Sequence, residues 1–117
     1  MLENKQIGID IVKIDRFREK SIFENESLYE KIFTKSEMTY CKKFSDPYPH
    51  FAGKFALKEA VQKSIIKNLV LNKIETFHSN SKPKIKLQNS KEKYNFISSI
   101  SHENEFAIAI VISEKTI

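Results

Sequence analysis

The chain has 117 residues, a length that predicts one domain, over residues 1–117, and no separate regulatory module. Hydrophobic residues make up 40% of it and only two residues are glycine, which excludes a disordered or low-complexity chain. The formal net charge of +5 favours an anionic partner, such as a nucleotide, an acidic protein, a nucleic acid or a membrane surface, although a basic surface can also serve solubility alone.

The first predicted element is a strand over residues 7–12, in which isoleucine alternates with other residues as in a half-buried strand. Its second face carries Gly8 and Asp10, two residue types that are depleted in strands. A charged helix is predicted from Asp15 onward. The piece that follows, residues 24–33, has an expected inner face of Leu28, Ile32 and Phe33.

Two helices are predicted in the middle of the chain. Thr34 and Glu37 have the spacing of a capping box. The helix that they open is expected to carry Met38, Cys41 and Phe44 and to stop at residues 46–49. A longer helix is predicted over residues 51–68. Cys41 is the single cysteine, so it cannot form an internal disulfide, and its apolar neighbours favour core packing.

The last third of the chain is expected to form strands. Two short ones, residues 73–77 and 84–87, flank a polar turn. A hairpin of residues 97–101 and 106–112 follows, with His102 where its first strand enters the turn. The expected turn residues are Asn80, Ser81 and Pro83. We therefore expect an α+β fold in which a mostly antiparallel sheet packs against a long central helix.

Localisation and assembly follow from length and hydropathy. No apolar run approaches the ~18 residues that a membrane helix needs, and no signal-peptide pattern is present. We expect a cytoplasmic protein with no membrane partner. A domain this small leaves much of its surface exposed, which favours an oligomer of identical subunits.

Two charged residues interrupt an apolar face of the long helix. Ala52, Phe55, Ala56 and Ile66 share this face at 3.6-residue spacing, and Glu59 and Lys63 fall in its middle. An exposed ion pair four residues apart contributes roughly 0.2–0.5 kcal/mol, and such a pair is the structural alternative. The apolar surroundings and the small alanines favour a ligand site equally well.

Asp10 alone can cap a turn or pair with a lysine. Together with Glu59 it supplies two hard oxygen ligands, which suit Mg²⁺ that completes its shell with water and phosphate oxygens. No nucleotide-binding loop of the Walker or Rossmann type is present, so basic side chains would hold the phosphates. His102 taken alone is a turn histidine, and His50 and His78 carry no signal.

Three sequence motifs resemble those of holo-acyl-carrier-protein synthases, the small 4′-phosphopantetheinyl transferases. The run FAGKFALKEAVQK, residues 51–63, closely resembles the central helix motif of this family. Residues 7–12 (IGIDIV) resemble its opening strand. The closing hairpin is matched by residues 99–102 (SISH) and 107–109 (AIA), and the segment between the first two motifs is matched by residues 33–37 and 40–41.

The resemblance implies a complete activity. Such an enzyme transfers the 4′-phosphopantetheine group of coenzyme A to a serine of apo acyl carrier protein and releases adenosine 3′,5′-bisphosphate, in support of fatty acid biosynthesis. The implied cofactor is Mg²⁺, with coenzyme A as substrate and the carrier protein as partner. The implied assembly is a homotrimer of the 4′-phosphopantetheinyl transferase fold, with sites between subunits.

Carried over residue by residue, the resemblance makes Asp10 and Glu59 the magnesium ligands and Lys63 the lysine near the reacting phosphate. These three residues are the implied catalytic set. The base that accepts the serine proton stays open among Glu59, Lys63 and a water on the metal. The implied coenzyme A contacts are Lys54, Lys63, Pro83 and His102. The implied carrier-protein contacts are Arg16, Arg18 and Lys20.

The chain departs from the family's pattern at three places. Lys54 stands where the family commonly has arginine, which exchanges a planar fork of donors for a point charge. Residues 64–68 (SIIKN) replace a glycine-containing stretch, and Asn80-Ser81 replaces Asn-Gly. The loops around the nucleotide are therefore where the chain differs most.

Two rival functions belong to other classes. The net charge and the dense lysines between residues 63 and 93 suggest a nucleic-acid-binding module, but the chain lacks an aromatic stacking array and a basic helix motif, so we expect no nucleic acid partner. A non-catalytic adaptor that docks an acidic protein is compatible with the loop departures.

Overall fold

The structure, a computed structural model, describes residues 3–88 and 90–116. A long strand opens the described chain, four helices follow, and four strands close it. The helices and strands are β1 (Lys5–Lys13), α1 (Asp15–Arg18), α2 (Glu26–Glu30), α3 (Lys35–Lys42), α4 (Tyr48–Ile65), β2 (Ile74–Ser79), β3 (Lys82–Leu87), β4 (Tyr94–His102) and β5 (Phe106–Lys115), with a 3₁₀ turn at Leu71–Lys73. The α+β class predicted from the sequence is confirmed.

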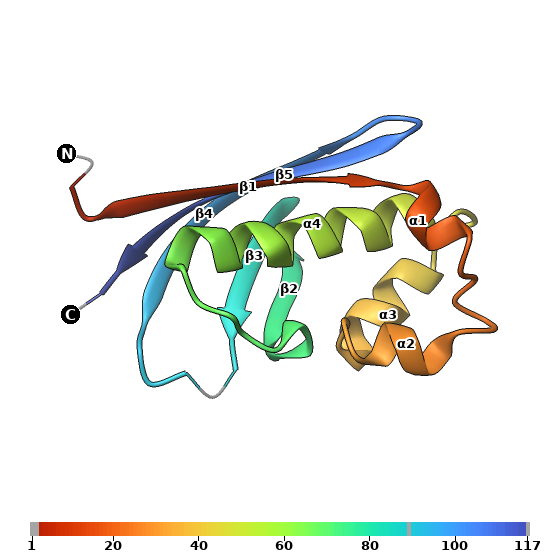
Figure 1. Cartoon of the computed structure of the whole chain (residues 1–117), viewed down its shortest axis with the longest axis horizontal. Helices are drawn as coiled ribbons and strands as arrows, with labels where there is room; N and C mark the ends of the chain where they lie inside the picture. Colours follow the sequence, from red (N-terminus) through yellow and green to blue (C-terminus); the bar gives the residue numbers. More distant parts are fainter. Residues whose placement is uncertain (1–2, 89, 117) are drawn as a thin grey trace.

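Two antiparallel sheets pack against α4. One sheet has the strand order β1-β5-β4, and the other is the β2–β3 hairpin. Figure 1 shows α4 running along one face of the three-stranded sheet, with α1, α2 and α3 gathered near its N-terminal half. In the described part of the chain, no helix is both long and apolar enough to cross a membrane.

Small residues on the inner face of the sheet let α4 approach it closely. Gly8, Ala107 and Ala109 are buried against the helix side of the sheet. A Cβ atom built on Gly8 would lie 2.0 Å from the carbonyl oxygen of Ala60 in α4. No side chain fits in that space, so backbone packs on backbone where β1 and α4 cross.

The isoleucine side of the sheet faces outward. Ile7, Ile9 and Ile11 of β1 are 53–63% exposed, whereas Gly8 and Val12 on the other face are buried. The exposed face continues across β5 and β4. Its further large apolar members are Ile97, Phe106, Ile108 and Ile110. The sequence predicted that one face of β1 would be buried. Within one chain, the buried face is the one that carries Gly8 and Val12, and the isoleucine face is exposed.

An ionic network is buried beside α4. The ammonium of Lys58 donates to Glu37 Oε1 at 2.6 Å and to the carbonyl oxygens of Ile32, Leu71 and Ile74 at 2.8–3.0 Å. Glu37 also completes the predicted capping box with Thr34. Its second oxygen accepts from the backbone and hydroxyl of Thr76 in β2. One ion pair therefore ties α3, α4 and β2 together.

The sequence prediction was wrong about both ends of α4. The helix begins at Tyr48 rather than residue 51, because Pro49 falls in its first turn, where the missing N–H has no intrahelical acceptor to lose. It ends at Ile65, and Ile66 is left-handed with φ of 55° and 80% exposed. Ile66 was expected on the apolar helix face, which it does not share.

Ile66→Gly is expected to stabilise the protein by up to about 1 kcal/mol, because the left-handed conformation strains a residue with a Cβ but not glycine. Urea denaturation should show a higher midpoint with an unchanged slope. Val70 is the matched control, since it is 63% exposed but has φ of −65°. Val70→Gly should lower the midpoint, and a loss of stability in both variants would contradict the assignment of strain to Ile66.

Three smaller expectations are corrected. Leu28 was assigned to an inner face but is 40% exposed, while Tyr29 beside it is buried. Phe44 lies beyond the end of α3 and is 37% exposed. Pro83, expected in a turn, lies in β3 opposite His78. Both residues of the intervening turn, Asn80 and Ser81, have positive φ, as a tight hairpin requires.

Candidate functional site

The structure brings Asp10, Glu59 and Lys63 together at the crossing of β1 and α4. The ammonium of Lys63 donates to Asp10 Oδ1 at 3.0 Å and to the carbonyl oxygen of Ile9 at 3.0 Å. The side chain of Asp10 is 16% exposed and that of Lys63 is 54% exposed. The close approach at Gly8 brings these side chains within reach of each other, since Gly8 and Asp10 share one face of the strand.

Glu59 lies one helical turn before Lys63 and is half-buried. Burial raises the pKa of its carboxyl, and the negative charge of Asp10 raises this pKa further, while Lys63 and Arg16 lower it. The two carboxylates therefore repel each other across the site. A group with this environment in an open pocket is typical of a functional residue.

A divalent cation fits this pair chemically. Hard carboxylate oxygens are preferred by Mg²⁺, and a cation between Asp10 and Glu59 would relieve the repulsion that raises the pKa of Glu59. Among residues 3–88 and 90–116, no group of three or more histidine, cysteine or acidic side chains could hold a metal. The remaining ligands would have to be water or the oxygens of a bound phosphate.

A pocket of about 430 Å³ opens beside these residues on the C-terminal half of α4. Glu59 and Lys63 form one side of it. The loop after α4 forms the other side, and it is held in place by an ion pair between Lys67 and Glu92 and by a hydrogen bond of 2.7 Å from Gln62 to the Leu69 carbonyl. The lining residues are Glu59, Gln62, Lys63, Ile66, Lys67 and Asn68.

Lys54 and His102 lie together at a second pocket, of about 180 Å³. Lys54 is 3% exposed, and its ammonium donates to the carbonyl and hydroxyl oxygens of Thr76 at 3.2 and 3.0 Å. Burial lowers the pKa of Lys54. The pocket is lined by Tyr40, Pro49, His50, Gly53, Lys54, His78, Ile100 and His102.

His50 and His78, which carried no signal in the sequence, also line this second pocket. His50 comes from the first turn of α4 and His78 from β2, so no spacing along the chain could have linked them to His102. Burial lowers the pKa of both imidazoles, and the charge of His102 lowers that of His50 further. Pro83 pairs with His78 in the hairpin and so lies nearby.

The two groups of predicted site residues lie on different sides of α4. Lys63 bonds to β1 in the three-stranded sheet, whereas Lys54 bonds to Thr76 in the β2–β3 hairpin. Successive helix residues turn by roughly 100°, so Lys54 and Lys63 project to about opposite sides. Within one chain, Lys54 and His102 therefore lie away from Asp10 and from the pocket lined by Glu59 and Lys63.

The predicted carrier-protein contacts differ in their surroundings. The guanidinium of Arg16 lies 5.1 Å from the centre of the Phe55 ring. Arg18 is engaged by Asp15 at 3.2 Å and by Asp46 at 2.5 Å. Lys20 is exposed beyond the end of α1. Arg16 and Lys20 line a pocket of about 290 Å³ whose apolar part includes Phe17, Leu28 and Phe55.

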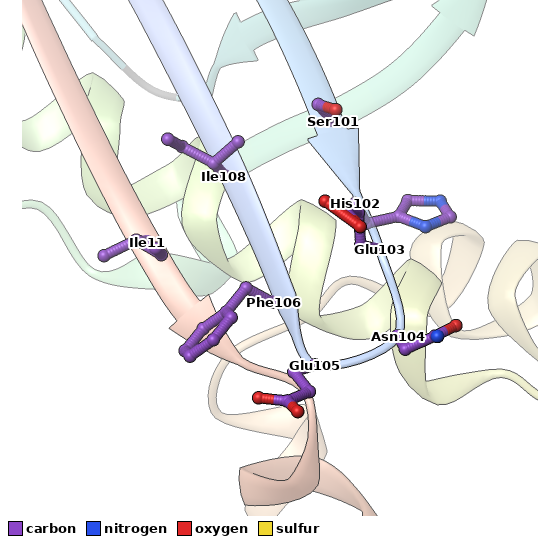
Figure 2. Close-up of a pocket in the computed structure, with 8 residues that line it drawn as sticks. All are labelled: Ile11, Ser101, His102, Glu103, Asn104, Glu105, Phe106 and Ile108. Atoms are coloured by element: carbon purple, nitrogen blue, oxygen red, sulfur yellow. The ribbon is translucent and has the colours of Figure 1, made fainter.

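A fourth pocket, of about 490 Å³, lies at the turn between β4 and β5. Figure 2 shows Ile11 and Ile108 from the paired strands β1 and β5, with Phe106 nearer the turn. The turn itself contributes Glu103, Asn104 and Glu105, and His102 points away from the apolar side chains. This pocket therefore belongs to the exposed isoleucine face.

Comparisons with known proteins cover nearly the whole chain. Residues 6–111 match the family model of the 4′-phosphopantetheinyl transferase superfamily. The chain is 40% identical to the holo-[acyl-carrier-protein] synthase of Thermodesulfovibrio yellowstonii, over 91% of this chain and 95% of that protein. It is 38% identical to the enzyme of the same name from Chlamydia felis, over 96% of this chain and 98% of that protein.

Solved structures agree with these matches. The holo-[acyl-carrier-protein] synthase of Helicobacter pylori, determined in complex with coenzyme A, superposes with a TM-score of 0.79. It is 34% identical and covers 92% of this chain and 99% of its own. The similarity in sequence and the similarity in fold therefore point to the same group of proteins.

Proposed function

The chain belongs to the 4′-phosphopantetheinyl transferase superfamily, and from this we propose that it is a holo-acyl-carrier-protein synthase. It transfers the 4′-phosphopantetheine group of coenzyme A to a serine of apo acyl carrier protein. The observation that carries the proposal is the meeting of Asp10, Glu59 and Lys63 beside an open pocket.

The transfer is a phosphoryl substitution. The serine oxygen loses its proton and forms a bond to the phosphorus that bears the pantetheine chain. The bond from this phosphorus to the bridging pyrophosphate oxygen breaks, and adenosine 3′,5′-bisphosphate leaves with the electron pair. Catalysis of such a step depends on positioning and on stabilising charge at the phosphate oxygens.

The chain's own residues suit this step. Lys63 is more than half exposed at the pocket, so its ammonium can donate to a phosphate oxygen. Glu59 lines the same pocket, so its carboxylate is one of the groups that could accept the serine proton. Asp10 and Glu59 would hold Mg²⁺, which when bound neutralises negative charge on the pyrophosphate.

The second pocket would hold the nucleotide end of coenzyme A. Lys54 and His102 are the predicted contacts there, and His50 and His78 add two imidazoles to the same wall. Since this pocket lies on the other side of α4 from Asp10, a single coenzyme A molecule would be bound by two subunits. One subunit would contribute Asp10, Glu59 and Lys63, and its neighbour the second pocket.

A basic surface near the first pocket would meet the acidic carrier protein. Arg16 lies close enough to Glu59 to lower its pKa, and Lys20 lies beside it at an apolar pocket. Arg18 would have to exchange Asp46 for a carrier carboxylate. Attraction between this surface and the carrier should speed their encounter and weaken with added salt.

We infer a homotrimer from the exposed isoleucine face. Soluble monomers rarely expose a contiguous apolar surface of this extent, and three β-strands contribute to it here. Burial against identical subunits would cover the face and bring the two pockets of neighbouring subunits together. Cytoplasmic localisation stays a prediction.

Ile9→Lys is expected to dissociate the trimer, because it puts a charge among the exposed isoleucines of β1, between Ile7 and Ile11. Sedimentation equilibrium should give three times the chain mass for the wild type and a smaller mass for the variant. Phe23→Lys is the control, since Phe23 is 78% exposed on a loop away from the sheet. A monomeric wild type would refute the trimer.

Mass spectrometry of the carrier tests the function itself. The protein is incubated with coenzyme A, Mg²⁺ and apo carrier protein, and the carrier is weighed. A gain of one phosphopantetheine that disappears with chelator is expected. A gain that is insensitive to chelator would reject the magnesium requirement, and no gain with the carrier still bound would instead favour the non-catalytic adaptor.

A further inference from the structure

We propose that the ammonium of Lys63 is the built-in counter-ion of Asp10 in the free protein, and that Lys63 must leave Asp10 before a divalent cation can be held there. The inference rests on the metal site of the proposed function. It adds that Lys63 moves from Asp10 to a phosphate in the pocket, so that phosphate binding frees the Asp10 carboxylate for the cation.

The contacts of Lys63 carry the first step. Its ammonium makes two hydrogen bonds of 3.0 Å, one to Asp10 Oδ1 and one to the carbonyl oxygen of Ile9. Among the residues that the structure describes, Lys63 is the only side chain that donates to the Asp10 carboxylate. Asp10 is 16% exposed, so little water screens the charge of this carboxylate.

Competition for Asp10 follows from charge. A divalent cation that is coordinated by Asp10 and Glu59 would lie within a few ångströms of an ammonium that still donates to the same carboxylate. Two positive groups so close in a partly buried site repel strongly. The lysine and the metal ion therefore exclude each other at Asp10.

Lys63 has somewhere to go. Its side chain is 54% exposed and lines the pocket of about 430 Å³ together with Lys67 and Asn68. Rotation of its flexible four-carbon stem carries the ammonium from Asp10 into this pocket. A phosphate in the pocket would accept the hydrogen bonds that Lys63 gives up, so phosphate binding and cation binding should strengthen each other.

Calorimetric titration with Mg²⁺, without coenzyme A or carrier, tests the inference. Lys63→Met keeps the length of the side chain and removes the charge, and it should bind Mg²⁺ about tenfold more tightly than the wild type. Lys63→Arg keeps a cation within reach of Asp10 and should bind Mg²⁺ as weakly as the wild type.

Lys67→Met is the matched control. Lys67 lines the same pocket but pairs with Glu92 rather than Asp10, so its loss should change the Mg²⁺ affinity by less than about twofold at physiological salt. If both methionine variants bound Mg²⁺ more tightly by the same factor, the effect would come from the overall loss of positive charge near the pocket, and this would overturn the inference. So would unchanged or weaker Mg²⁺ binding by Lys63→Met, or no detectable binding in any variant.

The outcome is separate from that of the proposed function. Tighter Mg²⁺ binding by Lys63→Met in a protein that transfers no phosphopantetheine would uphold the inference and reject the activity. Transfer by the wild type, together with unchanged Mg²⁺ affinity in Lys63→Met, would support the activity and reject the inference. Circular dichroism of each variant ensures that only folded protein is compared.

Discussion

Glu59→Gln is expected to lower the rate of phosphopantetheine transfer by about 10²- to 10⁴-fold, the range for loss of a positioned acid or base. The same variant should be more stable than the wild type when no metal is present. The substitution preserves shape and removes a negative charge that repels Asp10 in a half-buried position. Loss of activity with a gain in stability distinguishes a functional residue from a structural one.

The sign of the stability effect follows from the pKa. Glu59 has a raised pKa in the folded chain, chiefly through burial and then through Asp10, so folding disfavours its ionised form. This destabilisation is fully present above the folded pKa. It disappears as the pH falls toward 4.5, the ordinary value for an unfolded glutamate. The wild type should therefore approach the stability of Glu59→Gln on acidification.

Thermal melts in chelator at several pH values, combined with the carrier assay, check this prediction. Glu30→Gln is the control, since Glu30 is an exposed carboxylate at the end of α2. Glu30→Gln should change neither the rate of transfer nor the difference in thermal stability between neutral and acid pH. Near-normal turnover of Glu59→Gln would reject Glu59 as a metal ligand and as a base.

Lys58→Met is expected to lower the free energy of unfolding by about 3–5 kcal/mol, because it leaves the carboxylate of Glu37 charged and unpaired in the core. Both side chains of the pair are 0% exposed. The backbone carbonyls of Ile32, Leu71 and Ile74 lose the same donor. Ile32 follows α2, Leu71 precedes β2, and Ile74 is the first residue of β2. The loss should therefore loosen β2 as well as α3.

Lys54→Met is the matched control for Lys58→Met. Both lysines are buried in α4, but Lys54 donates to Thr76 and, among the residues that the structure describes, to no carboxylate. Its replacement should cost about 1–2 kcal/mol, the range for hydrogen bonds lost from a neutral partner. Urea denaturation measures both variants. Equal losses would show that burial of the lysine, rather than its pairing with Glu37, sets the effect.

Patterns within one element were predictable from the sequence. The capping box of Thr34 and Glu37 forms as expected, since it depends on residues three apart. The alternation in β1 and β5 also gave the right strands. The ends of α4 were not predictable, because Pro49 is as compatible with the first turn of a helix as with a stop before it, and Ile66 is an unusual residue for a left-handed end.

Pairing between elements was harder to predict. That Asp10 would meet Glu59 and Lys63 came from the family resemblance, since their charge pattern alone left a surface ion pair open. Nothing in the sequence indicated that Glu37 also pairs with Lys58. The capping box already accounted for this glutamate, and the same side chain serves in both interactions. His50 and His78 gather at one pocket through the folding of β2 against α4, which no local pattern encodes.

The contact at Gly8 has a consequence for tolerance to mutation. The spacing between Asp10 and the α4 residues is set where main chain lies on main chain, without an intervening side chain whose size could vary. Drift or redesign of the apolar core could therefore change many residues around α4 and leave the alignment of the three charged groups intact. Position 8 itself is the exception, since any larger residue there would separate strand from helix.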